Sequence, residues 1–272
     1  MLHVVATPIG NLGDISARAL ECLKSASMIA CEDTRRTWQL LTHFGIPRPE
    51  MVSYRQGNEE RIAEHVVAAV NAGREVALCS DGGYPGISDP GYRLIRKCAT
   101  ENVPYDVIPG ASAVNVALLM SGLSTSSFTF KGFPPRGPGA IRNWFAEEKD
   151  SDHTLICYES PFRVGHTLEA AYEVFGDREA AVCIELTKLH ERVSRGYLKD
   201  LAAEFKDAKV KGEVALVIAG ANPKFARAAA PSECGASDVP EPSASAHSSA
   251  SPAELPISCH DAPYGVSGGE GI

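Results

Sequence analysis

The first half of the chain alternates short apolar runs with stretches whose apolar positions recur at helical spacing. Four runs have the character of buried strands: Leu2–Ala6, Met28–Cys31, Val76–Cys79 and Tyr105–Ile108. The helical stretches between and after them begin near Ile15, Thr34, Asn58, Tyr92 and Ser112. Strands that alternate with helices predict a mostly parallel sheet with helices on both faces.

The pattern changes after Gly122. Further strands are expected at Ser127–Lys131, Thr154–Tyr158, Ala181–Leu186 and Val214–Ala219, with helices near Pro161–Phe175 and Leu198–Phe205. We therefore predict an N-terminal α/β domain at 1–123 and a second α/β domain, with a mixed sheet, at 124–222. Residues 223–272 are rich in Ala, Ser, Pro and Gly, so we expect a disordered low-complexity tail there.

Charge is unevenly distributed along the 272 residues, whose formal net charge is -8. Residues 231–272 contain six acidic residues and no Lys or Arg, which leaves 28 acidic and 26 basic residues in the remainder. A nucleic-acid ligand would therefore need a local basic patch. No leader-like or membrane-spanning segment is visible, and the cysteines form no C-x-x-C pair, so we expect a cytoplasmic protein with buried thiols and no metal site.

Three loops rich in Pro and Gly follow predicted strands: Thr7–Asp14, Ser80–Gly91 and Pro109–Ala113. Each loop alone is more simply explained as a turn, with Asp89 capping a helix that begins at Pro90. Because the strands are parallel, however, their carboxyl ends share one edge of the sheet, where open α/β sheets bind ligands. Convergence of the three loops therefore favours a ligand site. Neither a dinucleotide-binding G-x-G-x-x-G loop nor a P-loop is present.

Charged residues follow other strands. In the segment Cys31–Thr37, Asp33 could simply cap a helix, or Arg35 and Arg36 could hold an anionic substrate. In the second half, Tyr158–Arg163 and Glu185–Glu191 combine acidic and basic residues, and Ser160 before Pro161 is typical of a helix start.

Six of these stretches, in order, resemble motifs of the ribosomal RNA small-subunit methyltransferase I family, within the tetrapyrrole methylase superfamily. They are Thr7–Asp14, Glu32–Arg35, Ser80–Gly91, Tyr158–Pro161, Glu185–Lys188 and Lys211–Glu213. The resemblance implies a two-domain tetrapyrrole methylase fold, S-adenosyl-L-methionine in the interdomain cleft, and a homodimer. It implies 2′-O-methylation of a decoding-centre cytidine of 16S rRNA in the small ribosomal subunit.

The resemblance also implies roles for individual residues. Cofactor contacts would come from Pro8, Asp81, Gly82, Gly83, Tyr84, Ile87, Ser112, Ala113, Glu159 and Leu186. The base that removes the hydroxyl proton would be one of Glu32, Asp33, Glu159, Glu185 and Lys188. Candidate cations for the substrate are Arg35, Arg36 and Arg163.

The sequence departs from the family at three points. Gly82–Pro85 replaces a usual Ala-Gly-Thr-Pro, which puts the bulkier Tyr84 beside the cofactor. Pro109-Gly110-Ala111 stands where a Pro-Gly-Pro is common, and the low-complexity tail replaces a helical extension that several relatives carry. Two alternatives are therefore kept open: a tetrapyrrole C-methyltransferase, and a non-catalytic RNA-binding or ribosome-assembly module.

Overall fold

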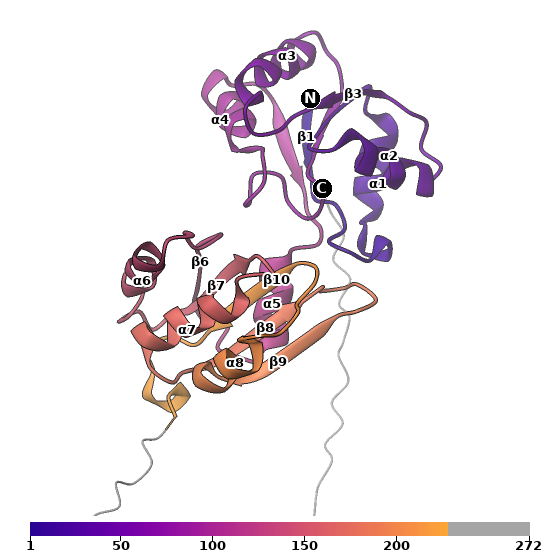
Figure 1. The fold of residues 1–272 in the computed structure, drawn as a ribbon. Coiled ribbons are helices and arrows are strands. Elements are labelled where there is room, and N and C mark those ends of the chain that lie inside the picture. The colour runs from indigo at the N-terminus through magenta and orange to yellow at the C-terminus, as the bar shows by residue number, and fades with distance from the viewer. Residues whose placement is uncertain (228–272) are drawn as a thin grey trace, which may run out of the picture. The chain divides into compact units, whose positions relative to one another are not determined.

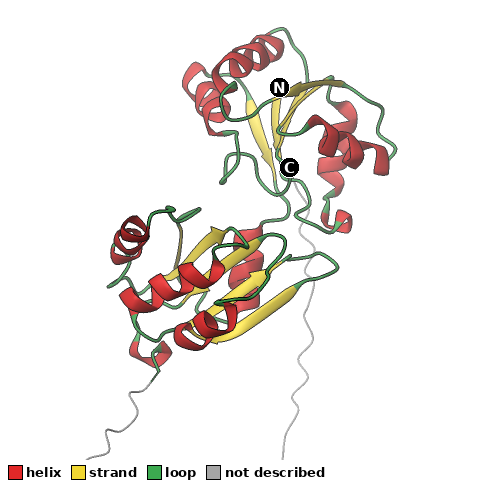
Figure 2. Cartoon of the chain, viewed as in Figure 1, coloured by secondary structure: helices red, strands yellow, loops and turns green. Residues whose placement is uncertain are grey.

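Two five-stranded sheets organise the computed structural model, which describes residues 1–227 (Figures 1 and 2). The first sheet contains β1 (Leu2–Val5), β2 (Met28–Cys31), β3 (Glu50–Ser53), β4 (Val76–Cys79) and β5 (Tyr105–Ile108). Its order is β3-β2-β4-β1-β5, and all neighbours are parallel. Strands β2 and β4 are buried along their whole length, which is why they read as unbroken apolar runs.

Helices cover both faces of this sheet. They are α1 (Ala17–Ser25), α2 (Thr34–His43), α3 (Glu59–Asn71) and α4 (Tyr92–Glu101). Leu41 of α2 packs in one core cluster with Ile29 of β2, on one face of the sheet. Val66 of α3 packs in a second cluster with Met28, the preceding strand residue, on the other face. The expected alternation of strands and helices is confirmed.

The second sheet has the order β6-β7-β10-β8-β9. Its strands are β6 (Phe128–Phe130), β7 (Thr154–Glu159), β8 (Glu179–Ile184), β9 (Arg192–Tyr197) and β10 (Val214–Ile218). Only the β6–β7 pair is parallel. The predicted fold class, a parallel first sheet and a mixed second sheet, is confirmed.

The second sheet is also covered on both faces. One face carries α6 (Pro138–Ala146), α7 (Val164–Phe175) and α8 (Leu198–Phe205). The other carries α5 (Ala113–Ser121), whose Val114 and Ala117 pack with Ile156 of β7. This helix precedes residue 123, the expected domain boundary, yet it packs on the second sheet.

Three elements were not expected from the sequence. Strands β3 and β9 lie at sheet edges, so their residues are mostly half-buried and lack a continuous apolar run. Helix α6 begins with Pro138 and Gly139, which are typical of a loop. Helix α4 begins at Tyr92 as expected, and its N-cap residue is Gly91, so the alternative in which Asp89 caps a helix that starts at Pro90 is wrong.

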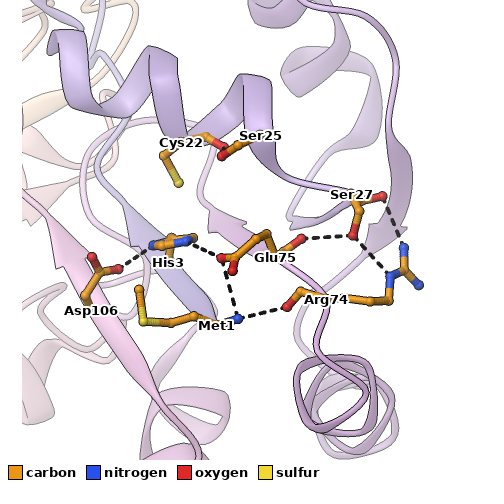
Figure 3. A network of polar contacts seen from close by, with 8 residues as sticks. All are labelled: Met1, His3, Cys22, Ser25, Ser27, Arg74, Glu75 and Asp106. Carbon is orange, nitrogen blue, oxygen red and sulfur yellow. Dashed lines mark hydrogen bonds and ion pairs between the residues drawn. The ribbon is translucent and has the colours of Figure 1, made fainter.

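A polar network closes the amino edge of the first sheet (Figure 3). The His3 ring lies between two carboxylates, with Nδ1 2.6 Å from Asp106 Oδ1 and Nε2 2.8 Å from Glu75 Oε2. The amino group of Met1 donates to the Arg74 carbonyl oxygen at 2.8 Å. The hydrogen bond from His3 lowers the pKa of Glu75. These contacts join the starts of β1, β4 and β5. The Pro/Gly loops that follow these three strands lie at the opposite edge of the sheet.

The structured chain continues a few residues past the expected end of the second domain. A 3-10 turn at Pro223–Phe225 packs Phe225 against the second sheet's core, and Arg227 pairs with Asp177 and Asp200. Residues 223–227 therefore pack on the second domain, whereas the sequence predicts that the disordered tail begins at 223. The rest of that segment, 228–272, lies outside the described residues.

Two expectations from composition can be compared with the described part of the chain. No helix among residues 1–227 combines the length and apolar character needed to cross a membrane. The six cysteines of this range are buried and form no disulfide.

The packing of α7 against α8 depends on Gly165. A Cβ atom there would lie 2.5 Å from the carbonyl oxygen of Phe205 and 3.0 Å from Lys206 Cα. We expect Gly165→Ala to lower the free energy of unfolding by about 1–3 kcal/mol, because backbone must move to relieve the clash. Gly139→Ala is the matched control, since a Cβ there meets no atom within 4 Å. Urea denaturation that gives the two variants equal stability would contradict this packing.

Candidate active site

Hydrogen bonds connect the three Pro/Gly loops at the carboxyl edge of the first sheet. Thr7, after β1, donates its N–H to the Gly83 carbonyl at 2.9 Å, and Gly83 donates back to Thr7 at 3.0 Å. The Tyr84 hydroxyl accepts the N–H of Gly110, after β5, at 3.1 Å. The predicted convergence of the loops is therefore confirmed. Tyr84, one of the three departures from the family pattern, thus connects the loop after β4 to the loop after β5.

Glycine is required at the centre of this arrangement. Gly83 has φ +81°, a conformation that other residues rarely adopt. A Cβ there would lie 3.4 Å from Ile9 Cγ2, within the loop after β1. At Gly10, in that same loop, a Cβ would collide with the side chain of Lys188 from the second sheet. Glycine thus allows the loops of the two sheets to approach closely, and the N–H of Asn11 donates to Thr187 Oγ1 at 3.1 Å.

A cavity of about 600 Å³ lies beside these loops, within the size range of small-molecule sites. Residues from both halves of the fold line it, including Tyr158 of β7 and Leu186 in the turn after β8. All ten residues expected to contact a cofactor line it: Pro8, Asp81, Gly82, Gly83, Tyr84, Ile87, Ser112, Ala113, Glu159 and Leu186. Their contact with a cofactor stays a prediction.

A second cavity of about 400 Å³ adjoins the first along helix α2. The two cavities share Pro8, Leu12, Arg36 and Asp81 as lining residues. Gln39 and His43 continue the second cavity at helical spacing from Arg36. This second cavity is thus continuous with the larger one along the start of α2.

Carboxyl groups give the larger cavity an acidic character. Burial, followed by the nearby charges of Glu32, Asp81 and Glu213, raises the pKa of Asp89 to about 7. Burial and the charge of Asp81 likewise raise the pKa of Glu32. All four groups line the cavity, which favours a ligand carrying positive charge. Sequence reasoning missed Asp89; the signal was an acidic residue without a basic neighbour in a Pro/Gly loop.

Asp33 and Arg35 do not line either cavity. The Asp33 carboxylate caps α2 by accepting the N–H of Arg35 at 2.8 Å, and it accepts Arg35 Nη2 at 2.6 Å. The Arg35 side chain holds the pKa of Asp33 well below its usual range. A carboxylate held in this way is a poor base. The simpler interpretation of this segment, a helix cap, holds for Asp33, and Arg36 is the residue that reaches both cavities.

Lys188 lines the larger cavity as an ammonium ion. Its Nζ lies 2.8 Å from Glu185 Oε1 and 3.1 Å from Glu213 Oε2. Burial alone would lower the pKa of Lys188, but hydrogen bonds to these two carboxylates outweigh it and raise the pKa. Lys188 is therefore protonated and unsuited to accept a proton. Glu185 does not line the cavity, and its hydrogen bond with Lys188 lowers its pKa.

Glu159 is only 2% exposed and fully engaged in hydrogen bonds. It accepts the N–H of Ser160 at 2.6 Å and the Thr167 hydroxyl at 2.5 Å. Arg163 lies 3.4 Å from the same carboxylate and donates to the Pro135 carbonyl at 2.7 Å. Glu159 and Arg163 thus shape the backbone at the end of β7. Helix α7 begins only at Val164, so Ser160 lies in a turn and does not start the helix.

Glu32 differs from the other four candidate bases in combining two properties. It lines the cavity, as Glu159 and Lys188 also do, but within residues 1–227 it forms no ion pair. Its raised pKa brings the carboxylate closer to the range in which general bases work. The described residues contain no cluster of three or more His, Cys, Asp or Glu side chains suited to a metal.

Sequence comparison places this cavity in a known context. The family described as Tetrapyrrole (Corrin/Porphyrin) Methylases matches residues 1–202. A relative named Ribosomal RNA small subunit methyltransferase I, from Halalkalibacterium halodurans, is 44% identical over 219 residues, which are 80% of this chain and 75% of the relative. A relative with the same name, from Thermotoga maritima, is 39% identical over 219 residues, 80% of this chain and 98% of the relative.

Solved structures share the fold at lower identity. Uroporphyrin-III-C-methyltransferase from Thermus thermophilus superposes with a TM-score of 0.56 at 20% identity, over 81% of this chain and 94% of that one. At this identity the likeness concerns the fold alone.

The acidic cavity predicts a pH dependence of stability. Because the folded state raises the pKa of Asp89 to about 7, it binds the Asp89 proton more tightly than the unfolded chain does. This contribution is present at low pH and is lost as the pH rises from about 4, the unfolded value, through about 7. We therefore expect Asp89→Asn to be more stable than the wild type at pH 8, relative to their difference at pH 4. Thermal melts across this range that show a constant difference would contradict the burial of Asp89 among Glu32, Asp81 and Glu213.

Proposed function

We propose that this chain, which belongs to the tetrapyrrole methylase family and is an S-adenosylmethionine-dependent methyltransferase, methylates the ribose 2′-oxygen of a decoding-centre cytidine in 16S rRNA. The observation that carries the substrate assignment is the similarity to relatives named ribosomal RNA small subunit methyltransferase I. The match covers 98% of the Thermotoga relative, so the part shared with this chain is nearly the whole of that protein.

The residues of the larger cavity suit the cofactor. Its volume of about 600 Å³ is in the range of nucleoside-sized ligands, and Gly82 and Gly83 allow a ligand to approach the backbone closely. The acidic groups Asp81 and Asp89 complement positive charge. S-adenosylmethionine, when bound, supplies an electrophilic methyl group on a positively charged sulfur. The protein's task is then to bind, orient and desolvate the two reactants.

Glu32 is the proposed base. A ribose hydroxyl that reaches the larger cavity beside Glu32 would lose its proton as its oxygen gains the methyl group and S-adenosylhomocysteine departs. A carboxylate with a raised pKa can hold that proton. Lys188, kept protonated by Glu185 and Glu213, instead provides a fixed positive charge at the cavity wall.

Arg36 is the proposed contact for the RNA backbone. It lines both cavities and lies 3.5 Å from Asp81 in a loose, exposed ion pair, so a phosphate can compete for it at low cost. Outside the acidic tail the charge is nearly balanced, so RNA binding would depend on local contacts and on shape. A folded small ribosomal subunit suits this kind of recognition. This substrate is cytoplasmic, and we propose that the enzyme acts there as a homodimer.

Cofactor binding should depend on the backbone of the loop after β4. Gly83→Val would strain a residue with φ +81° and push against Ile9, so we expect affinity for S-adenosylmethionine to fall at least tenfold. Gly45→Val is the control, because Gly45 also has a positive φ (+63°) but a Cβ there meets no atom within 4 Å. Calorimetry on the purified wild type that detects no binding of the cofactor at millimolar concentration would refute the site.

The substrate is tested with isotope-labelled cofactor. Small ribosomal subunits lacking the modification should acquire label at one cytidine 2′-oxygen, and uroporphyrinogen III should acquire none. Glu32→Gln should lower kcat by about 10²–10⁴-fold while preserving cofactor affinity, because only proton removal is impaired.

The outcomes separate the alternatives. Label in the tetrapyrrole alone would overturn the RNA assignment in favour of a tetrapyrrole methyltransferase. Cofactor binding without transfer to either substrate would favour a non-catalytic, RNA-binding role.

A further inference from the structure

Two exposed aromatic side chains belong to segments that line the larger cavity. Phe162 is 92% exposed and directly follows Ser160 and Pro161, which line the cavity. Phe133 is 57% exposed and lines the cavity itself. Leaving an aromatic ring in water forfeits its burial energy, so two such rings beside a reaction site need an explanation.

The backbone holds Phe162 rigidly. The N–H of Arg163 donates to the carbonyl of Ser160 at 2.9 Å, which closes a tight turn with Pro161 and Phe162 at its corners. The buried Glu159 carboxylate fixes the start of this turn by accepting the Ser160 N–H at 2.6 Å. The turn fixes the backbone from which the Phe162 ring projects, so binding a ligand there does not require that backbone to be ordered.

The same network positions Phe133. The Arg163 guanidinium lies 3.4 Å from Glu159 and donates to the carbonyl of Pro135, two residues after Phe133, at 2.7 Å. The Phe133 ring also packs edge-on against Tyr158, with ring centroids 5.6 Å apart. One buried carboxylate and one arginine thus connect the two segments that carry the exposed rings.

A cation accompanies these rings. Arg136 is exposed on the segment that begins at Phe133, and it makes no ion pair within the described range 1–227. Exposed aromatic rings beside an available arginine are the combination that binds single-stranded nucleic acid, through base stacking and phosphate contact. We propose that Phe162 and Phe133 form a stacking platform for an unpaired base next to the methyl acceptor, with Arg163 as its positioning residue. This inference deepens the proposed function and names the feature of RNA recognised at that site.

Direct binding tests the platform without requiring methyl transfer. Fluorescence anisotropy with a labelled single-stranded oligoribonucleotide should show affinity about 10–100-fold weaker for Phe162→Ala than for the wild type, the usual effect of losing one stacked base. Phe162→Leu should be similarly weak because it keeps apolar surface without a π face, whereas Phe162→Trp should bind like the wild type. Leu119→Ala is the matched control: Leu119 is 71% exposed on α5 and lines neither cavity.

Kinetics on small ribosomal subunits provide a second measurement. Phe162→Ala should raise KM for the subunit far more than it lowers kcat, with affinity for S-adenosylmethionine unchanged. Arg163→Lys should shift KM in the same direction, because a lysine cannot keep the paired contacts that join the two segments. If the wild type transfers no methyl group but its binding of the oligoribonucleotide still requires an aromatic residue at position 162, the proposed function is refuted and the platform is retained. Equal affinity of Phe162→Ala, Phe162→Leu and Leu119→Ala would overturn the platform, as would a loss of affinity that Phe162→Trp fails to restore.

Discussion

The reciprocal backbone pairing of Thr7 with Gly83 is the contact on which the site depends. It exists because β1 and β4 are parallel neighbours, so the loops that follow them emerge side by side. With β5 on the other side of β1, a third loop joins them, and Tyr84 connects it through the N–H of Gly110. Strand order therefore brings together segments that are about a hundred residues apart. The network around His3 joins β1, β4 and β5 at the opposite edge of the sheet.

The charges around the cavity divide into those already paired and those available. Glu159 with Arg163, Glu185 with Lys188, and Asp33 with Arg35 satisfy one another and shape the backbone. Glu32 and Asp89 remain as carboxyl groups whose pKa burial raises. This division matters because a group that is already hydrogen-bonded in a fixed pair cannot exchange a proton without losing that pair. We accordingly propose Glu32 as the base and a supporting, structural role for the paired residues.

Sequence patterns were sufficient for the layout and insufficient for the roles. Buried strands such as β2 and β4 are unbroken apolar runs, and the Pro/Gly loops after β1, β4 and β5 indicate a ligand site from sequence alone. Edge strands β3 and β9 carry no such signal because half their surface faces water. Nor could the sequence separate Glu32 from Glu159, since both follow strands and only the fold buries Glu159 against Ser160 and Thr167. The identity of the cofactor comes from the resemblance to the family, because no spacing of residues in this chain specifies S-adenosylmethionine.

A crystal structure with S-adenosylhomocysteine bound would test the central claim most directly. The account predicts density for the ligand in the cavity between the loops after β1, β4 and β5 and the second sheet. Its adenosine and amino-acid portions should contact the backbone near Gly83 and Ala113, and its sulfur should point toward the side that carries Glu32 and Arg36. Density for the ligand at any other place on the protein, or a sulfur facing away from Glu32, would contradict it.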